Sequence, residues 1–279
     1  MFQLSVNEVV PAFIPLPIPA TMNIGRGFVR DRDLADQQHL RSDLRLAMAV
    51  QRQMLPRRTK QLTTIRYAGT SAAARGIGGD YYDFLELAPG SLGFLLADVS
   101  GKGVAAALLM ANLQAAIRCE CPRGCGDLSA MLQSVNAHFF SSTLPEHYAT
   151  LFFGQCDDRT RSLSYINCGQ QPAIIIRGDR SIERLETTAL PPGLVRHWTG
   201  EKETVELRRG DTLWVCSDGA IEAGLESGQE LGEEGLISII TASSHRDMEL
   251  AVAGIAHAVS AWAPNGPTDD MTIVGIRAV

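Results

Sequence analysis

Four short acidic motifs are spread along this chain of 279 residues, and each adjoins an apolar run with the composition of a β-strand. Strand ends that lie far apart in the sequence can converge on one point of a fold, which a purely local cluster of acids does not require. The four motifs therefore constrain the fold and the position of a candidate site together. They read GGDYYD from Gly78, LLADVSGKG from Leu95, CSDG from Cys216 and TDDMT from Thr268.

The stretch from Leu95 to Gly103 is the most informative of the four. Its apolar run contains one carboxylate near its end, Asp98. Two glycines then precede the Ala-rich pattern of residues 104 to 117. This order predicts a strand, a tight turn and a helix. A carboxylate at the end of a buried strand, followed by glycines that let the backbone approach a ligand, is typical of sites for a hard cation or a phosphate.

The chain divides into three predicted parts. Residues 1–33 contain Pro11, Pro15, Pro17 and Pro19, and this density of proline predicts a flexible arm. Apolar residues at helical spacing then predict one amphipathic helix from Leu34 to Leu55, which Pro56 ends. We assign residues 34–58 to this linker or regulatory helix and residues 59–279 to a single domain.

Hairpin-forming strands and separate blocks of helix alternate within residues 59–279. This alternation favours an α+β fold with antiparallel sheets over a parallel βαβ sheet. The expected strands are 62–70, 81–87, 92–98, 150–156, 162–167, 173–177, 214–217 and 271–277, and the expected helices are 104–118, 128–141, 234–242 and 248–262.

Composition excludes several classes of protein. The formal charge of −6 and the isoelectric point near 5.5 argue against a nucleic-acid binder, which needs a basic face. No apolar run reaches the roughly 18 residues that a membrane span needs. The first residues lack the features of a signal peptide, and the six cysteines suit a reducing compartment, so we expect a cytoplasmic protein.

Three of those cysteines, Cys119, Cys121 and Cys125, form a C-x-C-x3-C group. Structural zinc sites want four ligands, and no further Cys or His follows at ligand spacing. We interpret the group as plain thiols at a helix end and keep a metal or redox role as the alternative.

Carboxylates at converging strand ends suit the binding of divalent cations, which catalyse the hydrolysis of phosphate esters among other reactions. Two divalent ions about 4 Å apart make a bound water nucleophilic and stabilise the phosphoryl oxygens. Carboxylates and backbone carbonyls are the ligands that such hard ions prefer. A chain that uses this chemistry needs no side-chain nucleophile.

Together and in this order, the four motifs resemble those of the PPM (PP2C-like) metal-dependent protein phosphatases, in particular the bacterial SpoIIE/RsbU branch. The resemblance covers roughly residues 40 to 279. It implies a four-layer αββα sandwich of two antiparallel sheets flanked by helices. It also implies a hydrolase with two Mn2+ or Mg2+ ions, in which a metal-bridged water attacks a phosphoserine or phosphothreonine directly.

The resemblance also assigns roles to individual residues. Asp98 would bridge the two ions, and the carbonyl of Val99 would add a ligand to the first. Asp218 and Asp269 would hold the second ion, and Asp80 would complete the first site through water. Asp98 and Asp218 would accordingly be the catalytic carboxylates.

Other polar residues near the motifs have open roles. Arg75 precedes Asp80 by five residues and is either a substrate-binding arginine or a solvated loop residue. Asp83 and Asp270 either contact metal-bound water, or support the metal ligands without touching the metal or its water, or stabilise a turn. The residues around Lys102 do not match the pattern of a P-loop. We therefore interpret Lys102 as a charge on the surface or facing the substrate.

The resemblance names partners as well. It implies that the substrate is a phosphorylated STAS-domain anti-anti-sigma factor in a partner-switching stress or developmental pathway. The helix at residues 34–55 would pack on its own domain or form a homodimer, and neither nucleic acid nor a membrane is expected as a partner. Two alternatives remain open: a binding module of the same fold with little turnover, and a hydrolase of small phosphate esters.

Overall fold

The computed structural model describes residues 26–56, 62–122, 126–243, 247–264 and 266–279, with the side chains of residues 26–35 and Ser227 left aside. The chain separates into two units: one ends at Arg45, and the other comprises Leu46–Val279. Most of the arm predicted at residues 1–33 and the first residues after the linker helix lie outside the described residues.

The helices are α1 Arg26–Met54, α2 Val104–Glu120, α3 Leu128–Ser142, α4 Asp218–Ile221, α5 Gly232–Ser243 and α6 Met248–Ser260, with a 3-10 turn at Leu225–Ser227. The strands are β1 Ile65–Ala72, β2 Tyr81–Ala88, β3 Ser91–Val99, β4 Ala149–Asp157, β5 Ser162–Cys168, β6 Ala173–Ile176, β7 Ile182–Leu185, β8 Glu203–Glu206, β9 Thr212–Cys216 and β10 Met271–Ala278.

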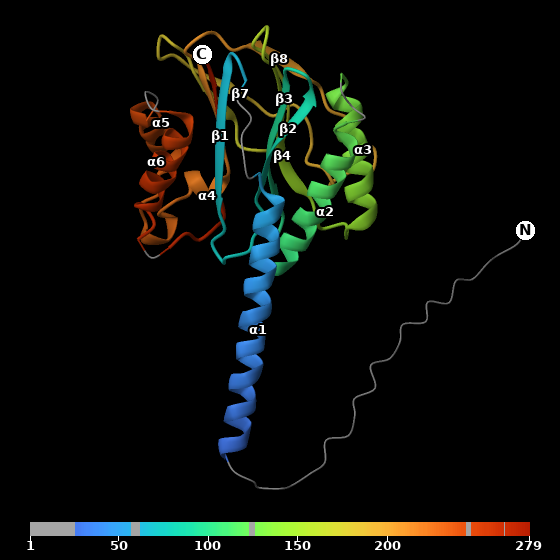
Figure 1. The fold of residues 1–279 in the computed structure, drawn as a ribbon, viewed down its shortest axis with the longest axis vertical. Coiled ribbons are helices and arrows are strands. Elements are labelled where there is room, and N and C mark those ends of the chain that lie inside the picture. The colour runs from blue at the N-terminus through green and yellow to red at the C-terminus, as the bar shows by residue number, and fades with distance from the viewer. Residues whose placement is uncertain (1–25, 57–61, 123–125, 244–246, 265) are drawn as a thin grey trace, which may run out of the picture. The chain divides into compact units, whose positions relative to one another are not determined.

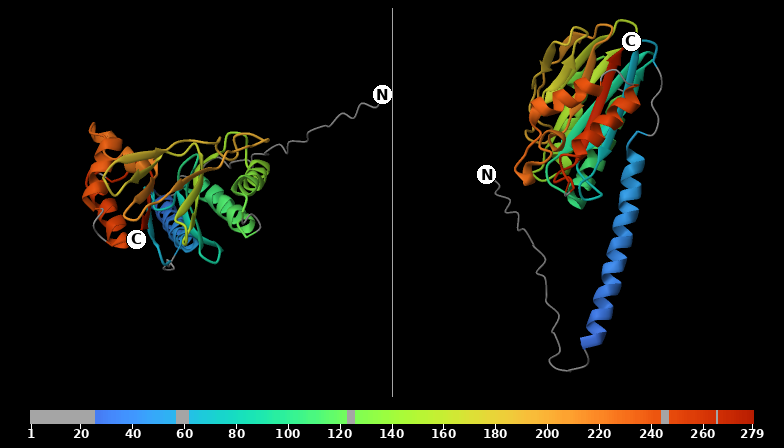
Figure 2. Two further views of the ribbon diagram at one scale, coloured as in Figure 1. Left: turned by 90° about the horizontal axis from the view of Figure 1, so that it is seen from above. Right: turned by 90° about the vertical axis from the view of Figure 1, so that its left-hand side faces the viewer.

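Two five-stranded antiparallel sheets form the middle of the larger unit, in the orders β1-β10-β9-β6-β7 and β2-β3-β4-β5-β8. Helices α5 and α6 cover the first sheet, and α2 and α3 cover the second (Figure 1 and Figure 2). The predicted α+β sandwich of four layers is therefore confirmed. Strand pairs far apart in sequence, such as β1 with β10, close the first sheet.

Strand β3 shows how the sequence builds these layers. Its side chains alternate between faces, as strand geometry requires. Leu95 and Val99 pack toward α2 and α3, whereas Phe94 and Leu96 pack between the two sheets. Nearly the whole strand is buried on both faces, which explains why it reads as a continuous apolar run.

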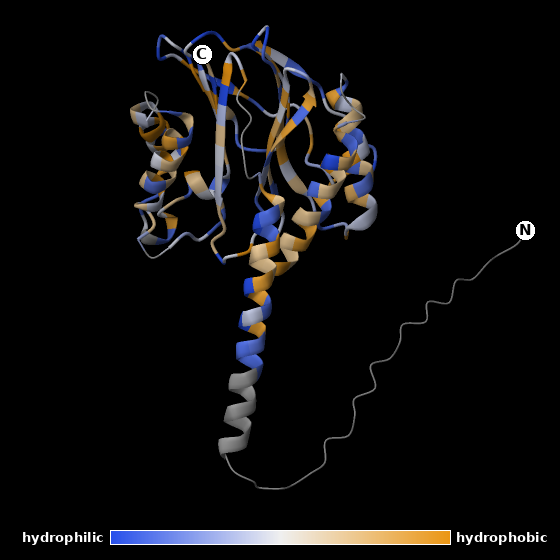
Figure 3. Cartoon of the chain, in the orientation of Figure 1, coloured by the Kyte–Doolittle hydropathy of each residue, from blue (hydrophilic) through white to orange (hydrophobic). Residues whose placement is uncertain are grey.

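Helix α1 begins at Arg26, eight residues before the predicted start at Leu34. The predicted start was wrong because the proline-rich arm was expected to extend to residue 33. Its last proline is Pro19, and residues 26–33 contain no proline that would prevent a helix. Polar and apolar residues alternate along the described part of this helix (Figure 3). No helix among the described residues is long and apolar enough to cross a membrane.

Candidate active site

The sheet registers bring the acidic motifs to one end of the sandwich. Strands β2 and β3 pair with Tyr81 opposite Ala97, so Asp80 lies opposite Asp98. Strands β9 and β10 pair with Ile273 opposite Cys216, which sets the Asp218 turn against the beginning of β10. The four predicted strand ends thus converge, although they are separated by up to 189 residues in sequence.

Glycines let these segments approach closely. A Cβ added to Gly79 would lie 2.7 Å from the carbonyl oxygen of Val99 and 3.3 Å from Asp98 Oδ1. A Cβ added to Gly219 would lie 2.2 Å from the carbonyl oxygen of Asp270. Real Cβ atoms do not come this close to backbone, so the glycines of the first and third motifs are needed to bring the acids together.

Asp80 is buried, and neither of its carboxylate oxygens has a hydrogen-bond partner among the described residues. Burial and the nearby Asp98 carboxylate raise its pKa well above the usual range, and the neighbouring hydroxyls of Thr272 and Ser217 oppose this only in part. The Ser217 hydroxyl donates instead to the carbonyl oxygen of Asp270, at 3.1 Å. A buried carboxylate without partners is unfavourable unless a cation accompanies it.

The other acids of the site repel one another. Burial and the carboxylates of Asp218, Asp269 and Asp270 raise the pKa of Asp98 to about 7. Burial, followed by the Asp269 carboxylate, also raises the pKa of Asp218. Several carboxylates crowded into a partly buried space form a strongly negative site, and a divalent cation would relieve their repulsion.

Lys102 supplies one positive charge at this point. Its Nζ lies 2.6 Å from Asp269 Oδ2, although the two residues are far apart in the chain. Arg75 is exposed and near enough to Lys102 to influence it electrostatically, and its guanidinium has no ion-pair partner among the residues that the structure describes. The acidic site therefore has one paired cation, Lys102, and a second, exposed cation, Arg75, close to it.

Asp270 and Asp83 have structural partners. Asp270 accepts hydrogen bonds from the backbone N–H groups of Ala74 and Gly79, at 2.9 and 2.8 Å, and thereby holds the loop before Asp80. Asp83 is fully buried and accepts hydrogen bonds from the Tyr81 hydroxyl, at 2.6 Å, and from the Arg118 guanidinium, at 2.7 Å. These contacts favour a supporting role for both acids over contact with metal-bound water: Asp270 holds a loop, and Asp83 joins strand β2 to helix α2.

Within the described residues, no three His, Cys, Asp or Glu side chains form a ready set of metal ligands. Two of the acids have other partners: Asp269 pairs with Lys102, and Asp218 Oδ1 accepts a hydrogen bond from the backbone N–H of Gly219, at 2.7 Å. The possible ligand atoms of the site are nevertheless all oxygens. They include the two carboxylate oxygens of Asp80, which have no hydrogen-bond partner among the described residues. These residues fit hard divalent cations such as Mn2+ or Mg2+.

Sequence reasoning missed a contact between α1 and the first motif. The side-chain amide of Gln51 donates to the carbonyl oxygen of Gly78, at 2.7 Å, and its carbonyl accepts from the N–H of Gly78, at 3.2 Å. The Met48 side chain packs beside Gly76 in the same loop. One signal in the sequence could have indicated this contact, a Gln placed shortly before the Met54-Leu-Pro56 end of the helix.

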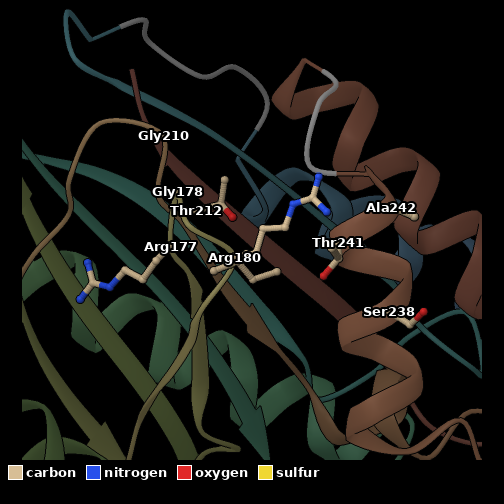
Figure 4. A pocket seen from close by; sticks show the side chains of 9 residues that line it. Arg177, Gly178, Arg180, Gly210, Thr212, Ser238, Thr241 and Ala242 are labelled. Atoms are coloured by element: carbon tan, nitrogen blue, oxygen red, sulfur yellow. The ribbon is translucent and has the colours of Figure 1, made fainter.

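A cleft of about 570 Å3 lies at the opposite end of β9. It is lined by Ile176, Arg177, Gly178, Arg180, Gly210, Thr212, Ser238, Thr241 and Ala242. Figure 4 shows that Arg177 points away from helix α5, and its guanidinium pairs with Glu183 and Asp211. Thr212 begins β9 whereas Asp218 follows its other end, so this cleft is separate from the acidic site.

The buried cysteines that the structure describes provide no nucleophile. Burial raises the pKa of Cys156 and of Cys216 to about 12, so both remain protonated at neutral pH. Cys119 is exposed, and Cys121 is buried with its sulfur 3.5 Å from that of Met131. Cys125 lies outside the described residues, so the zinc alternative stays untested.

Comparison with known proteins agrees with this arrangement. Residues 88–279 match the family model for stage II sporulation protein E (SpoIIE). Protein IcfG of Synechocystis sp. is 26% identical over 236 residues, which are 75% of this chain and 37% of the relative. Phosphoserine phosphatase RsbU of Bacillus subtilis is 26% identical over 193 residues, which are 69% of this chain and 57% of the relative. The chain therefore spans well under two thirds of either relative.

Solved structures share the fold. The SiaA-PP2C domain of Pseudomonas aeruginosa superposes with a TM-score of 0.77 at 21% identity and covers 88% of this chain and 98% of that domain. The catalytic domain of the serine threonine protein phosphatase PstP, solved with 2 manganese ions, superposes with a TM-score of 0.59 at 17% identity, covering 77% and 99%. The matched family model, the two-sheet fold and the converging acidic motifs show that this chain belongs to the SpoIIE family of PP2C-like phosphatase domains.

Proposed function

We propose that this chain is a Mn2+- or Mg2+-dependent phosphoserine/phosphothreonine protein phosphatase. The observation that carries the proposal is the buried Asp80 carboxylate, which lacks hydrogen-bond partners and faces Asp98 across the β2–β3 pair. A solely structural acid at this position would be expected to have donors around it. The relation to a phosphoserine phosphatase of Bacillus subtilis supports the same reaction.

Five groups would hold the two ions: the carboxylates of Asp80, Asp98, Asp218 and Asp269 and the carbonyl of Val99. When bound, such ions lower the pKa of water and stabilise charge on the phosphoryl oxygens. Asp98 and Asp218 would be the acids on which turnover depends most. Arg75, exposed and unpaired within the described residues, would contact the phosphate of the substrate.

The substrate that we propose is a phosphorylated STAS-domain protein in a partner-switching pathway. The similarity to RsbU supports such a pathway, and the site itself fits a protein substrate. Asp269 is 31% exposed, and Asp98 and Asp218 are partly exposed, so the carboxylates are open to a phosphoresidue on another protein.

We further propose that helix α1 controls the site. Gln51 holds Gly78 by two hydrogen bonds, and Gly78 lies two residues before Asp80. Any rearrangement of the helix end would therefore reach the loop that carries Asp80. Leu46 and Val50 lie one helical turn apart and are both exposed, which supports pairing with a second copy of the chain through residues 34–55.

The test is hydrolysis of a phosphorylated STAS-domain protein with EDTA, with Mg2+ and with Mn2+. The proposal predicts release of phosphate only with a divalent ion. If the protein binds the phosphorylated partner and releases no phosphate under any of these conditions, the chain is a binding module. If it cleaves p-nitrophenyl phosphate but not the phosphoprotein, it is a hydrolase of small esters.

A further inference from the structure

Exposed apolar side chains lie on three segments that hydrogen bonds and close packing connect to one another and to the Asp98 turn. Five of them, Val104, Leu108, Leu144, Tyr148 and Leu194, are between 39% and 69% exposed, and we call this group the apolar rim. Adjacent exposed apolar side chains are costly in water and commonly mark surfaces that bind other proteins. The rim comes from three segments of the chain, so it is not a by-product of one amphipathic helix.

Tyr148 fixes one end of the rim to the Asp98 turn. The backbone N–H of Ser100 donates to the carbonyl oxygen of Tyr148, at 2.9 Å. The backbone N–H of Tyr148 donates in return to the Ser100 hydroxyl, at 3.1 Å. Ser100 is two residues beyond Asp98, so the rim begins at the turn that presents this carboxylate.

Helix α2 and the end of α3 form the middle of the rim. Val104 and Leu108 are one helical turn apart and lie on the same exposed face of α2. The Ser142 hydroxyl donates to Asn112 Oδ1, at 3.1 Å, and joins the end of α3 to the next turn of α2. Leu144 follows Ser142 by two residues and therefore lies beside this face.

The loop that carries Leu194 closes the rim on the other side. The N–H of Ala149 donates to the carbonyl oxygen of Pro192, at 2.9 Å. A Cβ added to Gly193 would lie 2.8 Å from the carbonyl oxygen of His147, so this loop packs against the segment that leads to Tyr148. These contacts link the three segments that carry the rim residues.

We propose that the apolar rim is the docking surface for the phosphorylated protein substrate, and this inference rests on the proposed function. The position of the rim favours the protein substrate as its partner, because a protein that covers the rim places its own neighbouring residues over the Asp98 turn. The chemistry of the rim calls for a substrate whose phosphoserine or phosphothreonine is flanked by apolar side chains. Contacts remote from the reacting phosphate would then raise kcat/KM for the protein substrate specifically.

The test compares Leu108→Asp with Leu250→Asp. Leu250 is 63% exposed on α6, a helix that covers the other sheet, so the second variant controls for placing a charge at an exposed helical Leu. Each variant is assayed, in the full chain with Mn2+, on a phosphorylated STAS-domain protein and on p-nitrophenyl phosphate. Leu144→Asp, in a loop, is a second rim variant that does not depend on helix stability.

Both rim variants should lower kcat/KM for the phosphoprotein at least about tenfold more than for p-nitrophenyl phosphate, as expected when one buried Leu contact is lost. Leu250→Asp should leave both values unchanged. A similar fall on both substrates, or no fall on either, would overturn the docking inference while the proposed function stands. A wild-type chain that cleaves neither substrate would overturn the proposed function first, and the docking inference with it.

Discussion

At the scale of single residues, the acids of the site lower the stability of the metal-free protein. The pKa of Asp98 rises from 3.8 to about 7 on folding, so the folded state holds a proton that the unfolded state releases. The contribution of Asp98 to folding stability is therefore lost as pH rises from about 4 to about 7, by at most about 4 kcal/mol. Bound cations would remove this penalty.

We therefore predict opposite effects of Asp98→Asn on stability and on turnover. In EDTA the variant should melt at a higher temperature than the wild type, and the difference should grow between pH 5 and pH 8. With Mn2+ its turnover should fall at least about 10³-fold, because an ion-bridging carboxylate is lost. Thermal melts and p-nitrophenyl phosphate assays measure the two effects.

Glu234→Gln, which removes an exposed acid on α5, is the control and should change neither quantity. Lower stability of metal-free Asp98→Asn at pH 8 would mean that Asp98 has a structural role. Substantial turnover by this variant would contradict its assignment to the site.

The cysteines allow a second prediction at this scale. With a pKa of about 12, Cys156 and Cys216 should not react with iodoacetamide at pH 8 in the folded protein. The exposed Cys119 should react, and turnover should remain largely intact. Mass spectrometry of the modified protein locates the alkylated thiols, and a loss of turnover that follows modification of Cys216 would count against the account.

At the scale of elements, the end of α1 and the loop before Asp80 should act together. We predict that Gln51→Ala raises the Mn2+ concentration needed for half-maximal turnover several-fold. The variant loses two hydrogen bonds that hold the loop, and each such bond contributes about 1 kcal/mol to stability. Gln53→Ala, an exposed position on the same helix, is the matched control. An identical Mn2+ response of both variants would show that the helix end merely packs there.

Sequence patterns predicted most elements because the long strands are buried and strongly apolar. Strands β7 and β8 were missed: each has four residues, of which two are exposed in β7 and three in β8, and lacks the apolar alternation that identifies a strand. Helix α4 was missed because it is a single turn after Asp218. Strand ends predicted from composition were correct to within a few residues, since turns with glycine or paired acids mark them.

The acidic residues of the site were also visible in the sequence, because each follows or precedes an apolar run. Their partners were not visible. Lys102 pairs with Asp269 across 167 residues, and Asp270 reaches Ala74 across 196. Such pairs depend on how the two sheets are placed relative to each other and on side-chain rotamers, which no local pattern encodes.

At the scale of the whole molecule, the N-terminal helix should influence both assembly and activity. A chain shortened to begin near Thr59 should still fold, because both sheets and the four main helices that cover them lie beyond that point. It should differ from the full chain in association state and in its Mn2+ response. Light scattering and a metal titration check this, and identical behaviour of both chains would end the regulatory proposal.

A divalent-metal centre formed by the converging acids would make turnover depend on the bound ions. The decisive measurement is the turnover of p-nitrophenyl phosphate by the full chain, first after treatment with EDTA and again after Mn2+ is restored. We expect no measurable turnover in EDTA and its return with Mn2+. Turnover that persists in EDTA, or that fails to return with either Mn2+ or Mg2+, would contradict it.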